Sequence, residues 1–354
     1  EGALGESELA ELGIRDAAWA GDDVAPDYAH LGELFSPSVF SFTAADLERL
    51  CGFNRFDVTT GQDEVLFGLR GCRVSEGTSD AFSASVSLAE DVPDHVSRHC
   101  VLGVWRRSAR ELAVFPGSTV PNWRHMEEQR SKGGQRANML PTGRYQYTVG
   151  THRAVEGAFI LPGRVVVLRS NDDLVYETTD DWEEHAPADN IHPGFSDSAA
   201  DYSSAGCQTV PGSWSAAAGH TGAWARFRRR AGMTAHNRSR WGDRYVYILL
   251  TGREARLATT RPAPAVLTRL RFGSTGPDVQ TIQMGLSISG HYAGAYDGDM
   301  GPGTVMALIR WMKDEAERAA GASLLQPPAE AIVTPEKALA LGLDMIAGRS
   351  VATR

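Results

Sequence analysis

The stretch NIHPGFSDSAADYSSAGCQTVPG, residues 190–212, contains one histidine and one cysteine among many small residues. Gly206 directly precedes Cys207, Ser204 lies just before the glycine, and His192 lies fifteen positions upstream of the cysteine. A buried structural cysteine needs neither a flanking glycine nor a histidine. A nucleophilic cysteine needs an accessible sulfur and a base. The stretch therefore predicts a nucleophile, Cys207, with His192 as its base.

The small residues beside the cysteine fit this chemistry. Gly206 permits the backbone to approach a substrate carbonyl closely, and neighbouring N–H groups can then face a developing oxyanion. A free thiol has a pKa of ~8.5, so only a few per cent is thiolate at neutral pH and a base is needed. The segment from Pro211 onward has a helical composition, and the N-terminus of a helix there would favour the thiolate.

The chain around this stretch has the pattern of short β-strands. Runs rich in Val, Leu, Phe and Tyr alternate with turn-forming residues. The predicted strands are 64–74, 81–88, 99–107, 111–120, 143–153, 158–161, 164–170, 174–179 and 243–252. The middle of the chain is therefore expected to be mostly β, with one helix after Cys207.

The composition limits the class of protein. The chain has 354 residues, of which 42% are hydrophobic and 22% charged, as in a soluble globular protein of two or three domains. A net charge of −9 argues against a nucleic-acid partner, and the basic run 226–230 is expected to be a solvated helix face. No apolar run approaches the ~20 residues of a membrane span. Four cysteines are too few for a disulfide framework, so pairing among Cys51, Cys72 and Cys100 is left open.

A different pattern occupies the C-terminal part of the chain. It begins after a polar, proline-containing segment, 254–265, which is expected to be a linker. Beyond it, apolar positions at helical spacing follow Asp278, and a glycine-rich turn occupies 296–303. Thr304 is then expected to cap a second helix. These features predict a compact helical pair around a glycine-rich loop.

This helical pair resembles the peptidoglycan-binding domain 1 family. The matching positions are Leu270, Gly273, Gly276, Val279, Gln283, Leu286, Gly290, Asp297, Gly298, Gly301, Thr304 and Ala307. The resemblance implies a small three-helix domain, here 266–348, that binds peptidoglycan and accompanies enzymes of the cell wall.

The residues around Cys207 resemble the YkuD-type L,D-transpeptidase family, whose signature is a His, a gap of about this length, and Ser-His-Gly-Cys. His192 matches the catalytic His, and Ser204, Gly206 and Cys207 match three of the four signature positions. The upstream segment NMLPTGRYQYTVG, 138–150, is similar to the one that precedes the signature in that family. The resemblance implies a mostly-β catalytic domain in which these four residues are the catalytic candidates.

The resemblance also implies a reaction. Cys207 would form a thioester with a peptidoglycan stem peptide or crosslink, and His192 would act first as base and then as acid. The sequence departs from the family at two places. Ala205 stands where the family has His, and Gln208 with Thr209 replaces a pair that carries Arg or Asn. An L,D-transpeptidase and a related carboxypeptidase or endopeptidase therefore both stay open.

Other polar residues near the signature are weaker candidates. His152, Tyr202, Gln208 and Trp214 are candidates for binding substrate, and His185 is a further site candidate. Either Asp189 or Asp201 is positioned in the sequence to orient His192, and the sequence selects neither of them.

Two alternative functions remain. A zinc-dependent peptidoglycan peptidase would need a ligand motif that His185, His192 and Asp201 do not form, so neither a metal nor another cofactor is expected. A non-catalytic wall-binding protein on a transpeptidase-like scaffold is kept open by Ala205. Preferential alkylation of Cys207 over the other three cysteines would separate an enzyme from such a scaffold.

The chain is thus expected to be an α+β multidomain protein. Its parts are 1–62, a mixed segment of unknown role, then 63–253, the catalytic domain, then the linker and 266–348. The first part is expected to contain helices at 6–13 and at 42–53, the second with Thr43 as its N-cap before Asp46. The expected partner is peptidoglycan, and the expected location is extracytoplasmic: a periplasm, a cell wall, or a secreted or phage-borne protein. No signal peptide is visible in a chain that begins at Glu1, and the oligomeric state is not indicated.

Overall fold

The computed structural model describes residues 25–31, 35–134, 137–170, 175–196, 202–260, 269–321 and 328–341. The helix predicted over 6–13 and the candidate residue Asp201 lie outside these ranges.

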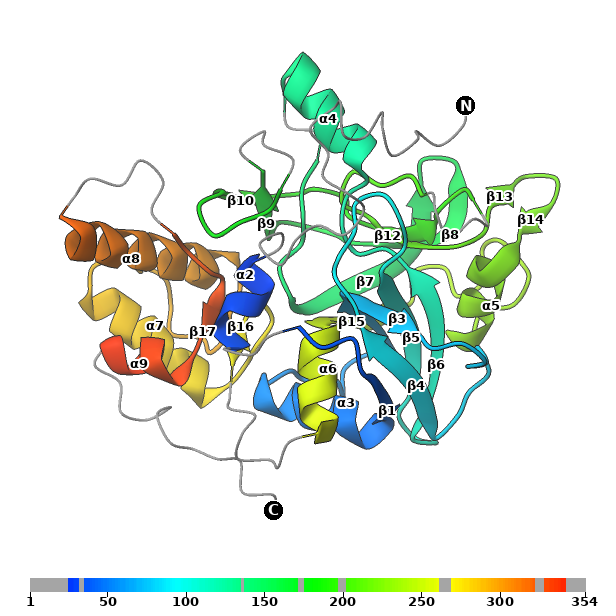
Figure 1. Ribbon diagram of the computed structural model, residues 1–354, viewed down its shortest axis with the longest axis horizontal. Coiled ribbons are helices and arrows are strands. Elements are labelled where there is room, and N and C mark those ends of the chain that lie inside the picture. The colour runs from blue at the N-terminus through cyan, green and yellow to red at the C-terminus, as the bar shows by residue number, and fades with distance from the viewer. Residues whose placement is uncertain are drawn as a thin grey trace.

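A mixed sheet of eight strands forms the centre of the molecule (Figure 1). In sheet order its strands are β12 (Gln208–Val210), β11 (Ile191–Pro193), β8 (Val155–Ile160), β7 (Gly143–His152), β15 (Arg244–Thr251), β2 (Glu64–Arg70), β5 (Cys100–Arg106) and β6 (Glu111–Gly117). The pairs β11–β12 and β15–β2 are parallel, and the other pairs are antiparallel. The two edges meet where Ser118 and Thr209 exchange backbone hydrogen bonds of 2.9 and 3.0 Å. This bridge makes the sheet nearly closed.

Residues along the strands alternate between two apolar clusters, as the period of a β-strand requires. In β15, for example, Tyr247 belongs to one cluster and Ile248 to the other. The cluster that contains Ile248 also contains apolar residues of α3 (Ala44–Phe53) and α6 (Gly252–Thr260), which cover this face of the sheet. Both faces of the central strands are thus buried, which explains their nearly continuous hydrophobic sequences.

A second sheet lies beside α3 and α6. It consists of β1 (Val39–Thr43), β4 (Ser85–Glu90) and β3 (Cys72–Val74), all antiparallel. Thr43 caps α3 as predicted: its Oγ1 accepts a hydrogen bond from the Asp46 N–H, and the Asp46 carboxylate accepts one from the Thr43 N–H. The short α2 (Ala25–Tyr28) and 3-10 turn η1 (Ala29–Leu31) precede this sheet in the chain.

Three further elements lie outside these two sheets: α4 (Trp123–Lys132), β9 (Val165–Arg169) and β10 (Asp181–His185), of which the last two form a hairpin. The strand predicted over 174–179 is wrong for its described residues, 175–179. There the Glu177 N–H donates to the Asp180 carboxylate at 2.9 Å and the chain turns. Such a local side-chain acceptor competes with strand pairing.

The helix after Cys207 begins later than predicted. Residues 214–220 form a small hairpin of β13 (Trp214–Ser215) and β14 (Gly219–His220), and α5 (Gly222–Arg230) follows it. Gly219 has a φ of +66°, which a glycine tolerates and which closes the hairpin. The predicted helix N-terminus at Pro211, and its effect on the thiolate, are therefore wrong.

The C-terminal part is helical, as predicted. It contains β16 (Leu270–Arg271), α7 (Pro277–Ile288), α8 (Pro302–Ala320), β17 (Ile332–Val333) and α9 (Pro335–Ala340). These helices lie together at the left of Figure 1. The N-cap of α8 is Gly301, so the prediction that Thr304 caps the helix is wrong. The Thr304 hydroxyl instead accepts a 3.1 Å hydrogen bond from Gln283, whose Oε1 accepts the Gly298 N–H and so holds the glycine-rich loop.

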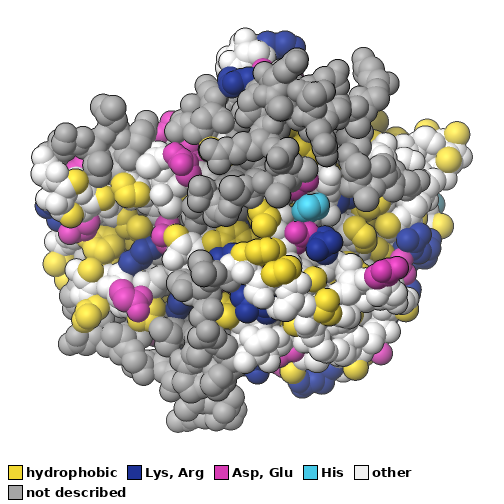
Figure 2. Space-filling view, in the orientation of Figure 1, with side chains coloured by type: hydrophobic (Ala, Val, Ile, Leu, Met, Phe, Trp, Pro, Cys, Tyr) yellow, Lys and Arg dark blue, Asp and Glu magenta, His cyan; other side chains and the backbone are white. Residues whose placement is uncertain are grey.

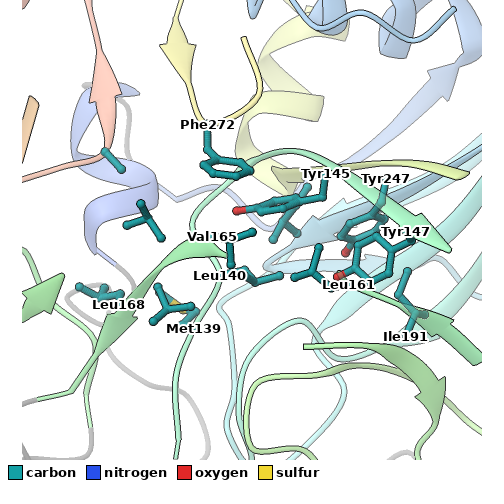
Figure 3. Packing of buried hydrophobic residues seen from close by; sticks show 14 of the residues in the cluster. Met139, Leu140, Tyr145, Tyr147, Leu161, Val165, Leu168, Ile191, Tyr247 and Phe272 are labelled. Carbon is teal, nitrogen blue, oxygen red and sulfur yellow. The ribbon is translucent and has the colours of Figure 1, made fainter. Parts of the chain in front are cut away.

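The C-terminal part contacts the large sheet through the residues of and just after β16. Residues 252–260, most of which were predicted to be linker, form α6, and its buried Glu254 pairs with the buried guanidinium of Arg271 at 2.6 Å. The ring of Phe272 stacks on Tyr145 of β7 with centroids 4.8 Å apart (Figure 3). The two parts therefore share one hydrophobic core.

The protein is thus of the α+β class. Within the described residues, no helix has the length and apolar character needed to cross a membrane. All four cysteines are free and buried. On the face shown in Figure 2, basic, acidic and hydrophobic side chains of the described residues are interspersed, without a large patch of one charge.

Candidate active site

His192 and Cys207 are brought together by a parallel strand pair. In the register of β11 with β12, His192 is the partner of Thr209, two positions after Cys207. The Gln208 N–H donates to the Asn190 carbonyl at 2.9 Å, which fixes this register beside the cysteine. The two predicted catalytic residues, fifteen positions apart in the sequence, thus lie side by side, as the spacing suggested.

Both residues line a cavity of about 540 Å³. Its walls come from five segments, and its lining residues include His125, Asn138, His152, Arg153, Ala188, Asp189, Asn190, Phe195, Ser204 and Ala205. His192 is 2% exposed and Cys207 is 8% exposed, so both side chains are buried although they line the cavity.

Ser204 holds the turn that precedes the cysteine. Its hydroxyl donates to the Cys207 carbonyl at 2.6 Å and accepts the Gly206 N–H at 3.0 Å. The Asn138 N–H donates to the Ala205 carbonyl at 2.9 Å, which ties the turn to the segment before β7. Ser204 thus positions the nucleophile through the backbone, and its hydroxyl is occupied by these two bonds.

Gly206 is required by the packing at this turn. Its φ is +152°, a conformation that residues with a Cβ rarely adopt. A Cβ there would also lie 2.4 Å from Oδ1 of Asp189 and 2.5 Å from Nδ2 of Asn138. The groups that lie close to this glycine are two buried side chains, and its close approach to a substrate carbonyl stays a prediction.

The proton of the neutral His192 ring is placed by its neighbour. Nδ1 lies 2.7 Å from the carbonyl oxygen of Pro193, and a carbonyl only accepts hydrogen bonds. Nδ1 therefore carries the proton, and Nε2 has the free lone pair that a general base needs. Burial and the neighbouring His152 lower the pKa of His192 to about 3, so the ring is neutral at physiological pH.

The thiol is also neutral in the resting site. Burial raises the pKa of Cys207, and the nearby Asp189 carboxyl raises it further. The sulfur donates weakly to the Ala188 carbonyl at 3.5 Å. The resting pair is therefore a thiol and a neutral imidazole, not a thiolate–imidazolium ion pair.

Asp189 does not contact His192, although it was a candidate for orienting it. Its carboxylate accepts a hydrogen bond from Asn138 Nδ2, and its backbone carbonyl accepts the Tyr147 hydroxyl at 2.7 Å. Burial raises the pKa of Asp189 to about 8, so the group is mostly protonated at pH 7. The carbonyl of Pro193 orients His192 instead.

His152, at the end of β7, also lines the cavity, and its hydrogen bonds fix which of its ring nitrogens carries the proton. The Asn190 Oδ1 accepts the Leu161 N–H at 2.8 Å, so the amide nitrogen of Asn190 must face Nδ1 of His152, 2.7 Å away. An amide nitrogen only donates, so Nδ1 accepts and the neutral His152 ring carries its proton on Nε2. The rings of His152 and His192 are stacked with centroids 4.5 Å apart and planes 7° from parallel.

A ring nitrogen of His152, one of His192 and the Cys207 sulfur lie within 4.8 Å of one another, so these residues form a set of potential metal ligands. Coordination by Nε2 of His152 would require its proton to move to Nδ1, where it would face the amide hydrogens of Asn190. Metal binding thus needs a rearrangement of this hydrogen-bond network, and the expectation of no metal stays a prediction.

The other candidates lie around the site or away from it. Tyr202 is buried, and its hydroxyl donates to the carbonyls of Asp94 and Pro121, so it packs the wall. Gln208 is buried: its Nε2 donates to the Gly206 carbonyl, and its Oε1 accepts a hydrogen bond from the Tyr247 hydroxyl. Trp214 lies on β13 and His185 on β10, and neither lines the cavity.

Among the lining residues that were not predicted are Asn138, Asn190 and Arg153. The first two belong to the segments 138–150 and 190–212 that the family resemblance and the opening stretch had already singled out. Arg153 directly follows His152 in the β7–β8 turn, with a φ of +51°. The signal that could have identified Arg153 in the sequence is its position directly after the candidate residue His152.

No protein-family model, curated protein or solved structure matches this chain. The resemblances to L,D-transpeptidases and to peptidoglycan-binding modules therefore stay predictions.

Proposed function

We propose that the protein is a cysteine acyltransferase or peptidase that acts on the peptide part of peptidoglycan, of the L,D-transpeptidase-like class. The observation that carries the proposal is the pairing of Cys207 with His192, whose base nitrogen is free because the Pro193 carbonyl holds the proton on Nδ1. A cavity of about 540 Å³ gives substrate access to both residues.

The proposed reaction starts from the neutral pair. As the Cys207 sulfur attacks a peptide carbonyl, its proton passes to Nε2 of His192, and a carbon–sulfur bond forms with the charge on the carbonyl oxygen. His192 then returns that proton to the leaving amine, the carbon–nitrogen bond breaks, and a thioester remains. An acceptor amine or a water attacks the thioester, loses a proton to His192, and the regenerated thiol leaves.

The cavity favours an anionic substrate group. Arg153 is exposed at its mouth, and among the described residues no carboxylate is paired with it. Asp189 is the carboxyl group among the lining residues, and it is mostly protonated at neutral pH. A stem peptide carries carboxylates beside its peptide bonds, so Arg153 is suited to hold one of them.

The C-terminal helices supply the proposed attachment to the wall. They resemble a peptidoglycan-binding module, and the C-terminal part is held to α6 by the Arg271–Glu254 ion pair and to β7 by the Phe272–Tyr145 stack. A polymer bound there would raise the local concentration of stem peptides at the cavity. Such a substrate places the protein outside the cytoplasm.

The proposal is tested with purified peptidoglycan. Wild type, Cys207→Ala and Cys51→Ala are incubated with it, and the muropeptides are analysed by mass spectrometry. Cys51 is a buried cysteine of α3 that does not line the cavity, so its variant is the matched control. Wild type and Cys51→Ala should change crosslinks or terminal residues, and Cys207→Ala should not. Equal change by all three would place the chemistry elsewhere, and binding without change by any would favour the non-catalytic alternative.

A further inference from the structure

The two stacked histidines of the site carry their protons on opposite nitrogens. In His192 the Pro193 carbonyl fixes the proton on Nδ1, which leaves Nε2 as an acceptor. In His152 the Asn190 amide, itself fixed by the Leu161 N–H, leaves Nε2 as a donor. The same ring atom is thus a base in one residue and a hydrogen-bond donor in the other, although the planes are only 7° from parallel.

Among the hydrogen bonds of the described residues, none uses the Nε2–H of His152, so this donor is available to a substrate. Its Nδ1 is occupied by Asn190, and the ring is only partly buried at the cavity. Protonation of both nitrogens is opposed, because a hydrogen on Nδ1 would face the hydrogens of the Asn190 amide. The ring therefore remains a neutral donor while His192 takes up and returns a proton.

We propose that His152 is a second functional imidazole, which donates its Nε2–H to the negative charge that develops at the reacting centre beside Cys207. This inference rests on the proposed function. A ring nitrogen of His152 lies within 4.8 Å of the Cys207 sulfur, so a substrate carbonyl oxygen bound beside the sulfur would lie near this ring. No bond to His152 forms or breaks, since it stabilises charge only.

The proposal accounts for Ala205. At this position the resembling family has a histidine, and this chain has none in the turn before Cys207. His152 enters the same cavity from the β7–β8 hairpin, so the site still contains two imidazoles. A preorganised donor aimed at developing charge typically contributes about 10²–10³ in rate.

Two substitutions separate charge stabilisation from packing. His152→Phe keeps an aromatic ring to stack on His192 but removes the donor, and His152→Gln removes the ring but keeps an N–H donor. The probe is 4-nitrophenyl acetate, which acylates a nucleophilic thiol with release of one 4-nitrophenolate. Wild type, both variants, His192→Gln and Cys207→Ala are compared in the pre-steady-state burst.

If His152 is a donor, the Phe variant should be acylated roughly 100-fold more slowly than wild type, and the Gln variant should lie within about tenfold of it. The reverse order, with Phe close to wild type and Gln slow, would show that the ring only packs and would overturn the proposal. If wild type shows no burst that depends on Cys207 and His192, the proposed function itself fails, and the role of His152 fails with it.

A measurement on the unmodified protein tests the proton positions without any variant. The ¹⁵N chemical shifts of labelled histidines distinguish a protonated ring nitrogen from an unprotonated one. We expect His152 to be protonated on Nε2 and His192 on Nδ1 at pH 7. A proton on Nδ1 of His152 would overturn the inference even if Cys207 is a nucleophile.

Discussion

Gly206 and Asp189 are in direct contact: a Cβ atom on Gly206 would lie 2.4 Å from Oδ1 of the aspartate. This contact places a protonated carboxyl group under the backbone that carries the nucleophile. It also links the loop of Cys207 to the residue that precedes Asn190, and hence to the network that fixes the tautomer of His152. The contact explains why this position requires a glycine for packing as well as for chemistry.

Replacement of Gly206 by Ala should therefore displace Asp189 or the turn. The strained φ costs about 1–3 kcal/mol, and the overlap with buried groups adds a comparable amount. We expect the free energy of unfolding, measured with urea, to fall by at least 2 kcal/mol. The matched control is Gly303→Ala in α8, where a Cβ meets no atom within 4 Å, and it should leave stability unchanged or raise it.

Asp189→Asn should change the thiol only at alkaline pH. The folded pKa of about 8 means that Asp189 is protonated and neutral at pH 6, as an amide is, and ionised at pH 9. The ionised form raises the pKa of Cys207, so its removal should make alkylation of Cys207 by iodoacetamide several-fold faster at pH 9 and leave it unchanged at pH 6. Asp299→Asn, at an exposed aspartate in the C-terminal loop, is the control and should have no effect at either pH.

The same substitution predicts a stability change with a definite sign. The pKa of Asp189 is raised on folding, so the folded state binds more protons than the unfolded state between pH 3.8 and about 8. Stability from this group is lost as the pH rises through that window. Asp189→Asn should therefore gain stability relative to wild type as the pH is raised from 5 to 9, and a constant difference would contradict the assignment.

His192 predicts the opposite pH dependence. Its folded pKa of about 3 lies below the unfolded value of 6.5, so the unfolded state takes up the proton first as the pH falls. Each pH unit in this window costs about 1.4 kcal/mol, which gives about 2 kcal/mol between pH 6 and pH 4.5. His192→Gln should remove that part of the acid sensitivity in urea titrations. The control His185→Gln, on β10 outside the cavity, should retain the wild-type dependence.

Arg153→Gln should weaken substrate binding without disabling the nucleophile. A charge-assisted hydrogen bond to a carboxylate contributes roughly 1.5–3 kcal/mol, which corresponds to at least a tenfold rise in KM for a muropeptide with a free stem carboxylate. The burst with neutral 4-nitrophenyl acetate should stay near its wild-type rate. Arg164→Gln, an exposed arginine paired with Glu184, is the control. An equal loss with both probes would mean that Arg153 supports the fold of the hairpin and not the substrate.

Local sequence signals predicted much of this fold. Alternation marks β7, where Tyr145, Tyr147 and Val149 are buried and their neighbours are not. The Thr43–Asp46 spacing predicted a capped helix, and the helical period predicted α7 and α8. Each of these signals depends on residues close in sequence, which is why it could be read without the structure.

The wrong predictions lie where contacts between residues distant in the sequence determine the local structure. The polar residues at 254–260 suggested a linker, but Glu254 is paired with Arg271 and the apolar face of α6 is buried against the sheet. The alanines after Trp214 suggested a helix, whereas the positive φ of Gly219 closes a hairpin there. In the site, Cys207 and His192 were predicted from their spacing. The tautomers of the two histidines depend on Asn190, Leu161 and Pro193, whose hydrogen bonds no spacing specifies.

The most direct test of the central claim is to trap the covalent intermediate. Wild-type protein is mixed with soluble muropeptides, quenched in acid within seconds, and analysed by intact-protein and peptide mass spectrometry. The proposal predicts an acyl adduct on the peptide that contains Cys207, with the leaving amine lost from the substrate, and no adduct in Cys207→Ala. Turnover of the muropeptides by wild type and by Cys207→Ala alike, with no adduct on the cysteine, would contradict it.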